Sequence, residues 1–219
     1  MKNIAVVARK GGSGKTTIAV NLAIAAYRRC YGVQIADTDP QGSATEVLKA
    51  RRIGGPQVVR LSGGAFYQLH TGAPAPNIDL TILDTPAASE DAIGHAIALA
   101  HLTLLVVRPT FLDIAAALQT AEILRRLRKP GLIVVSQAPV AREGVEPPAV
   151  KRAIAALRMM QLPVVPTVIR GRAIYQTSLA TGQSVEEVSG GAPAAEEIAA
   201  LWTYIERFVF GARNASVAA

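Results

Sequence analysis

The chain of 219 residues has a single cysteine, few aromatic side chains, and no apolar run as long as the roughly 18 residues that a membrane-spanning helix needs. One cysteine, Cys30, cannot form an internal disulfide, and we expect it to pack as a small apolar group at the end of a helix. The N-terminus begins with a strand pattern and lacks the architecture of a signal peptide. These absences indicate a cytoplasmic protein.

Acidic residues are scarce relative to basic ones: 16 Asp and Glu stand against 23 Lys and Arg, which gives a net charge of +7. The basic residues gather at Arg51-Arg52, at Arg125-Arg126-Arg128-Lys129, at Lys151-Arg152 with Arg158, and at Arg170 and Arg172. Any one cluster fits an ordinary solvated surface. Together they favour non-specific binding of double-stranded DNA, because cations neutralise phosphates and release counterions. The few aromatics argue against a stacking platform for single strands.

The most informative segment is a glycine-rich loop, Arg9-Lys10-Gly11-Gly12-Ser13-Gly14-Lys15-Thr16-Thr17, which follows the apolar run 4–8. Glycines allow backbone N–H groups to approach phosphate oxygens, and the helix expected next offers its positive end to the same anion. Lys15 can reach the β- and γ-phosphates, and the Thr16 hydroxyl can bind Mg²⁺. The loop therefore predicts a nucleotide site over Lys10, Gly11, Gly12, Ser13, Gly14, Lys15, Thr16 and Thr17.

Carboxylates follow two further apolar runs. Asp37 and Asp39 lie on alternate residues after the run 33–36, so their side chains leave the strand end in the same direction. Asp84 ends the run 80–83. Carboxylates beside Mg²⁺ can bind it through water or orient an attacking water. We therefore expect all three near the glycine-rich loop.

Strand and helix patterns alternate along the chain. We predict strands near 3–8, 33–37, 57–60, 79–84, 102–107, 131–135 and 164–168, and helices near 15–30, 43–52, 90–100, 112–128, 147–160, 173–181 and 194–210. Runs such as 102–107 and 132–135 are apolar without alternation, as in parallel strands buried on both faces. The expected fold is an α/β, three-layer, doubly wound and mostly parallel sheet in one domain over residues 1–219. The segment 72–76 is expected to be a loop.

The loop with its additional lysine, the segment Asp37-Thr38-Asp39-Pro40-Gln41 and the Asp84 strand together resemble the deviant-Walker-A ATPases, a family that includes ParA, Soj, ParF and MinD. The likeness covers roughly the whole chain and is weakest at the C-terminus. It implies a P-loop ATPase that uses ATP and Mg²⁺ and forms a homodimer with ATP. A single cysteine argues against the iron–sulfur relatives of this superfamily, which hold a cluster with paired cysteines.

The resemblance assigns roles to individual residues. Lys10 would be the signature lysine that reaches across the dimer interface, Lys15 the ordinary P-loop lysine, and Asp39 the aspartate that orients the hydrolytic water. Thr16, Asp37 and Asp84 would surround Mg²⁺, the aspartates through water. At Ser136-Gln137 many relatives place an asparagine that reads adenine, so this site leaves ATP and GTP both open.

The resemblance also implies a cellular role. The ATP-bound dimer would bind DNA non-specifically and position a plasmid, a chromosome region or a protein cargo, while a ParB-like or small adaptor protein stimulates hydrolysis. The protein would then be bacterial and nucleoid-associated. Arg170 and Arg172 lie in the loop that resembles the family's DNA-contacting end, and Arg125, Arg126, Lys151 and Arg152 are further DNA-binding candidates.

Two other functions stay open. Trp202, Tyr204, Phe208 and Phe210 in the last predicted helix could belong to a MinD-like amphipathic membrane anchor. We prefer docking of this helix on the core, because Glu196, Glu197 and Glu206 would oppose an anionic membrane. The other possibility is a P-loop metabolic enzyme with a small-molecule acceptor.

Overall fold

The computed structural model describes residues 1–61, 77–87 and 90–211. Its strands are β1 (Lys2–Val7), β2 (Val33–Asp37), β3 (Gln57–Arg60), β4 (Leu80–Asp84), β5 (Leu102–Val107) and β6 (Gly131–Val135). Its helices are α1 (Lys15–Arg28), α2 (Ser43–Ala50), α4 (Glu90–Leu99), α5 (Phe111–Arg126), α6 (Pro148–Arg158), α7 (Ala173–Ala180), α8 (Val185–Val188) and α9 (Pro193–Phe210). The predicted loop at 72–76 lies outside the described residues.

The strands form one parallel sheet in the order β3-β2-β4-β1-β5-β6. β1, β2 and β4 to β6 are almost wholly buried, which explains their uninterrupted apolar sequences. Since β1 is flanked by β4 and β5, the loop that follows β1 emerges in the middle of the carboxyl edge of the sheet. Ligands of open α/β sheets bind at this edge.

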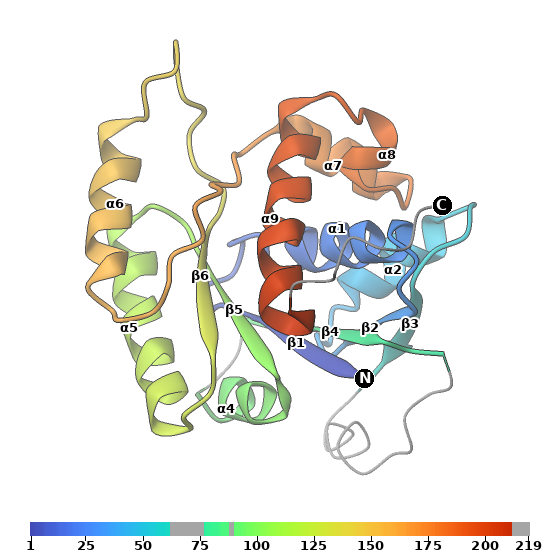
Figure 1. The fold of residues 1–219 in the computed structure, drawn as a ribbon, viewed down its shortest axis with the longest axis horizontal. Helices are drawn as coiled ribbons and strands as arrows, with labels where there is room; N and C mark the ends of the chain where they lie inside the picture. The colour runs from blue at the N-terminus through green and yellow to red at the C-terminus, as the bar shows by residue number, and fades with distance from the viewer. Residues whose placement is uncertain (62–76, 88–89, 212–219) are drawn as a thin grey trace.

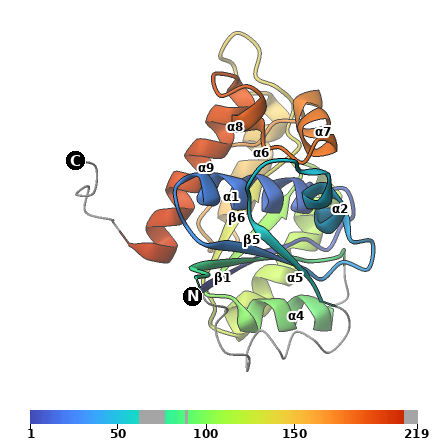
Figure 2. The ribbon, with the colours of Figure 1, turned by 90° about the vertical axis from the view of Figure 1, so that its right-hand side faces the viewer.

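Helices cover both faces of the sheet, as Figure 2 shows from the side. Ile4 and Val6 of β1 pack on the face covered by α1, α2 and the C-terminal helices, whereas Ala5 and Val7 pack on the opposite face against α4, α5 and α6. Because successive side chains of a strand point to opposite faces of the sheet, they pack into two separate apolar cores. The predicted doubly wound, three-layer parallel fold is confirmed.

The last predicted strand is wrong. Residues 164–168 contribute only an isolated parallel bridge between Val164 and Ile133 of β6. Pro166 has no N–H to donate to a ladder, so the segment runs beside the edge of the sheet without forming a strand. The short helix α8 was not predicted as a helix.

The expectation for Cys30 is also wrong, because this residue is exposed and has a positive φ of 62°. It follows the last turn of α1, where the chain must reverse towards β2, and its N–H bonds to the carbonyl of Tyr27. The geometry of the turn, and not the apolar character of the side chain, decides its position.

Candidate functional site

The glycine-rich loop connects β1 to α1 at the centre of the carboxyl edge (Figure 1). Gly12 and Gly14 have φ of 70° and 91°, a region that side-chain-bearing residues rarely occupy. Gly14 is the N-cap of α1, so the free N–H groups of the first helical turn face the loop. The backbone therefore has the shape of a phosphate cradle.

The two loop lysines differ in their surroundings. Lys15 is buried and its Nζ donates to the carbonyl of Lys10 at 3.4 Å. Burial lowers the pKa of Lys15, while the charges of Asp84 and Asp39 act to raise it. The Lys10 side chain is exposed, and among the described residues its ammonium makes no hydrogen bond or ion pair. Lys15 thus contacts the backbone of its own loop, whereas the Lys10 ammonium has no partner within the described residues.

Asp84 and Thr16 form the part of the site suited to a metal. Thr16 Oγ1 donates to Asp84 Oδ2 at 2.8 Å, and Asp84 Oδ1 is buried and has no hydrogen-bond partner among the described residues. Burial raises the pKa of Asp84 to about 7, with further contributions from Asp37 and Asp39, while the Thr16 hydrogen bond and Lys15 oppose the shift. A buried carboxylate with one unpaired oxygen and little positive charge around it fits Mg²⁺. The ion would bind the Thr16 hydroxyl and, directly or through water, the Asp84 carboxylate.

Protein groups alone would not hold the ion. Within the described ranges no group of three or more His, Cys, Asp or Glu side chains is placed to hold a metal. Mg²⁺ is commonly held by one or two protein ligands together with water and substrate phosphates. Thr16 and Asp84 therefore fit a Mg²⁺ that arrives with a nucleotide.

Asp37 has a different environment from the one the sequence predicts. Its carboxylate is fully buried and accepts three hydrogen bonds: from the N–H and the hydroxyl of Thr45, at 2.8 and 2.7 Å, and from the N–H of Asp39 at 3.2 Å. Asp37 thus anchors the first turn of α2 and the backbone of Asp39. Its role near the metal stays a prediction, and its hydrogen-bonding capacity is already largely used.

Asp39 lies beside the loop in a tight turn. Its Oδ1 accepts from the N–H of Gln41 at 2.9 Å, and its charge acts on both Lys15 and Asp84. Arg60, at the end of β3, donates to the carbonyl of Pro40 at 2.6 Å and packs against Gly42. Sequence reasoning missed Arg60, although a lone arginine ending a strand near this turn was a usable signal.

Ser136 and Gln137 follow β6 and reach the same loop. A Cβ added at Gly14 would lie 2.9 Å from Ser136 Oγ and 3.4 Å from Gln137 Nε2. Ser136 and Gln137 are thus adjacent to the P-loop in this chain.

The arginines expected to contact DNA divide into two groups. Arg170 makes two hydrogen bonds to Glu146, at 2.7 and 2.6 Å, and Arg172 bonds to Glu197 at 2.8 Å. By contrast Arg125, Lys151 and Arg152 are exposed and have no carboxylate partner among the described residues, and Arg126 contacts Glu90 only loosely at 3.6 Å. Arg170 and Arg172 are therefore neutralised by carboxylates, whereas the cations of α5 and α6 are available to bind phosphate.

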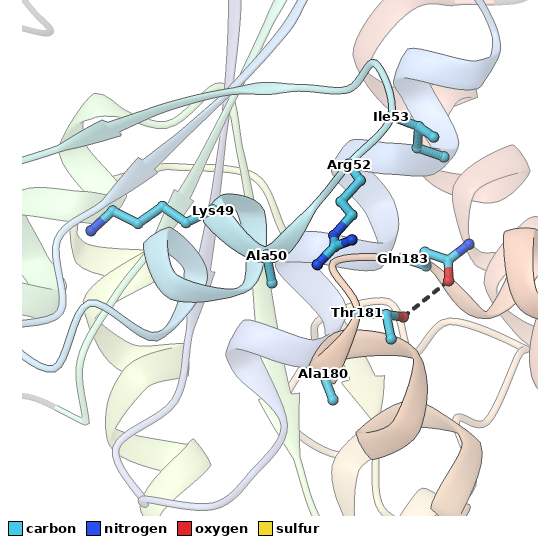
Figure 3. A pocket seen from close by; sticks show the side chains of 7 residues that line it. All are labelled: Lys49, Ala50, Arg52, Ile53, Ala180, Thr181 and Gln183. Atoms are coloured by element: carbon cyan, nitrogen blue, oxygen red, sulfur yellow. Dashed lines mark hydrogen bonds between the residues drawn. The ribbon is translucent and has the colours of Figure 1, made fainter.

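A hollow of about 560 Å³ lies away from the P-loop, between the end of α2 and the turn after α7 (Figure 3). Arg52 points across it towards Thr181 and Gln183, whose side chains hydrogen-bond at 3.0 Å. The side chain of its neighbour Arg51 is buried and forms an ion pair with Glu187, so this basic cluster is partly structural. The hollow is lined by Lys49, Ala50, Arg52, Ile53, Ala180, Thr181 and Gln183.

The fold and the loop define a P-loop nucleotide-binding protein. Residues 4–191 match the family model of the CobQ/CobB/MinD/ParA nucleotide binding domain, so the chain belongs to this family. It is 31% identical over 205 residues to the maintenance of carboxysome distribution protein A of Halothiobacillus neapolitanus. The matched region covers 89% of this chain and 92% of that protein.

Solved structures agree with the fold. The ATP complex of a variant of McdA from Cyanothece matches with a TM-score of 0.74, 19% identity and coverage of 95% of this chain and 96% of that one. The septum site-determining protein MinD from Pyrococcus horikoshii, complexed with Mg-ADP, matches with a TM-score of 0.75, 17% identity and coverage of 94% and 96%. The predicted family and fold are thus confirmed.

The buried Asp84 carboxyl leads to a pH-dependent prediction for the nucleotide-free protein. In the folded chain burial raises the pKa of Asp84 to about 7, well above the ordinary Asp value of 3.8. The folded state, which binds this proton more tightly than the unfolded state, has its full stability from Asp84 below pH 3.8. That part of the unfolding free energy is lost as the pH rises to about 7. We expect Asp84→Asn, which removes the titration, to unfold at a higher temperature than the unsubstituted protein at pH 8, with a smaller gain at pH 5. Scanning calorimetry at both pH values tests this; an equal gain at both would contradict it.

Proposed function

We propose that this protein is an ATP-dependent dimerising switch, which binds DNA non-specifically as an ATP-bound dimer and releases it after hydrolysis. The observation that supports the proposal is the difference in surroundings between the two loop lysines. Lys15 is buried against its own loop, while the exposed Lys10 ammonium is left without a partner among the described residues. A second cation at an occupied cradle is best accommodated by the phosphates of a facing subunit.

The positioned cargo is the second part of the proposal. The curated relative that matches nearly the whole chain is named for carboxysome distribution, which favours a large protein assembly over a plasmid or chromosome region. A ParB-like or small adaptor protein would link the cargo to the dimer and stimulate hydrolysis. A pull-down from cells with and without ATP, using the Asp39→Ala variant, would test for this adaptor.

A membrane-bound switch is less well supported. Trp202 is fully buried, and Phe210 stacks on Tyr31 with ring centroids 4.7 Å apart, so these aromatics dock α9 on the core. Phe208 alone among the four is largely exposed, at 52%. No helix among the described residues has the length and hydropathy to cross a bilayer. An amphipathic anchor would need more exposed apolar surface than α9 offers.

The layer of α5 and α6 offers the more suitable DNA-binding surface. Both helices follow parallel strands on the same face, so their C-terminal turns point to the same edge of the sheet (Figure 1). These turns carry the exposed cations Arg125, Arg126, Arg128 and Arg158, while Lys151 and Arg152 are exposed on the first turns of α6. Desolvation and pairing leave Arg170 and Arg172 less to offer a phosphate.

Charge reversal separates the two groups of arginines. We expect Arg125→Glu and Arg152→Glu each to weaken DNA binding to the same extent on unrelated sequences, because phosphate contacts do not depend on base sequence. Each lost phosphate contact should also lower the log–log salt slope by about 0.9. Basal ATP hydrolysis should stay near normal. Arg170→Gln should instead lower the unfolding temperature, since it leaves Glu146 unpaired. Fluorescence anisotropy on two duplexes at several salt concentrations, with ATP and with ADP, provides the measurement.

The same titrations decide between the candidate functions. Equal binding with ATP and ADP, or no binding with ATP at low salt, would reject the DNA scaffold. Co-sedimentation with anionic liposomes only in ATP would then establish the membrane switch. Nucleotide consumption that requires an added small molecule would identify a metabolic enzyme instead.

A further inference from the structure

Arg108 lies beside the P-loop because of the register between two neighbouring strands. β1 and β5 are parallel, and Val7 of β1 is paired with Leu105 of β5. Three residues onward from each partner, Lys10 lies in the loop after β1 and Arg108 directly follows the end of β5. The carboxyl edge of the sheet therefore brings a second long cation to the mouth of the loop.

Asp113 holds the Arg108 guanidinium in place. Arg108 Nε and Nη2 donate to the two oxygens of the Asp113 carboxylate at 3.0 and 3.2 Å. The Thr110 hydroxyl also donates to Asp113, and the N–H of Asp113 donates back to Thr110, which caps the N-terminus of α5. Since Asp113 is buried, the guanidinium is fixed to the rigid start of a helix.

The third nitrogen of the guanidinium is left over and faces the loop. Among the described residues Arg108 Nη1 has no hydrogen-bond partner, and a Cβ added at Gly12 would lie only 3.8 Å from it. A narrow hollow of about 10 Å³ separates Arg9 and Lys10 from Asp113, so the loop and the start of α5 are close neighbours. Arg108 thus presents two N–H donors to the Gly12 side of the cradle.

We propose that Arg108 Nη1 binds the terminal phosphate of a nucleoside triphosphate held in the P-loop of the same subunit, so that the site favours ATP over ADP. The proposal rests on the proposed nucleotide function. An arginine already paired on one edge with a carboxylate is pre-organised, and little side-chain freedom is lost when its other edge binds phosphate. Lys15 and Arg108 of one subunit then both act on the phosphate with the greatest negative charge.

A purely structural role predicts a different result. If Arg108 only caps α5 through Asp113, its loss would destabilise the protein without changing the choice between nucleotides. If Nη1 reached the nucleotide of a facing subunit, its loss would spare binding by the monomer and reduce only turnover or dimerisation.

The test compares the affinities of the monomer for ATPγS and ADP, each with Mg²⁺, by isothermal titration calorimetry. Sedimentation at the same protein concentration verifies the monomeric state. We expect Arg108→Gln to weaken ATPγS binding about 10- to 100-fold, the cost of one charge-assisted hydrogen bond, and to change ADP affinity less than about threefold. Arg108→Lys keeps the charge without the fork and should lose part of the preference for ATPγS.

Arg207→Gln, which changes an exposed arginine in the last turn of α9, is the matched control and should leave both affinities unchanged. An unchanged ATPγS to ADP ratio in both Arg108 variants, or loss of turnover alone, would overturn the proposal. If the unsubstituted protein bound neither nucleotide, the proposed function itself would fail. The two failures are therefore distinguishable.

Discussion

Lys15→Ala is expected to abolish nucleotide binding, whereas Lys10→Ala should bind nucleotide nearly as well as the unsubstituted protein and yet fail to dimerise and hydrolyse ATP. Lys15 is buried beside Asp84 and Asp39, so its removal deletes the buried cation of the cradle and leaves those carboxylates to repel the phosphates. Lys10 is exposed and its ammonium has no partner among the described residues, so the monomer loses little without it.

Titration with a fluorescent ATP analogue measures both affinities, and sedimentation with ATP measures dimerisation. Lys49→Ala is a suitable control, because this exposed lysine forms an ion pair with Glu46 on its own helix and with no other carboxylate in the described part of the chain. Equal loss of affinity in Lys10→Ala and Lys15→Ala would contradict a role for Lys10 across the dimer interface.

Asp39→Ala should retain ATP binding and lower turnover by roughly 10²–10⁴-fold, the range typical of acid–base and positioning groups. Asp39 is only half-buried, and within the described residues its carboxylate accepts one hydrogen bond, from the backbone N–H of Gln41 in the turn before α2. It is thus free to orient a water without being needed for the folding of α2, a task carried by Asp37. The variant should accumulate as an ATP-bound dimer.

Size-exclusion chromatography with ATP, together with phosphate release, tests this expectation. Asp91→Ala, which removes an exposed aspartate from the first turn of α4, controls for the change of net charge. A variant that binds ATP normally and remains monomeric would refute the trapped-dimer interpretation.

Local signals in the sequence predicted most of the fold and the P-loop. The apolar runs of β1, β4, β5 and β6 predicted buried parallel strands, and the glycine pattern predicted a loop whose positive φ values only glycine adopts easily. The edge of the sheet was harder to predict. Residues 164–168 have a strand-like composition, and their pairing failed because Pro166 cannot donate to a ladder.

The availability of charged groups could not be read from the sequence. Arg170 and Arg172 have the composition of a DNA-binding loop, yet Glu146 and Glu197, distant in sequence, occupy their guanidinium groups. Asp37 and Asp39 are likewise alternate residues at the end of β2, but Thr45 of α2 donates to the carboxylate of Asp37 and not to that of Asp39. Each outcome depends on partners that only tertiary packing supplies.

The sequence by itself determined the phosphate cradle and the parallel sheet, because both follow from local backbone freedom and from apolar periodicity. Tertiary structure decided which charges remain free: it paired Arg170, Arg172 and Asp37, buried Lys15 and Asp84, and placed Arg108 beside Gly12. The physical reason is that the interaction of a charge depends on distance and desolvation, and both are set by elements far apart in the chain.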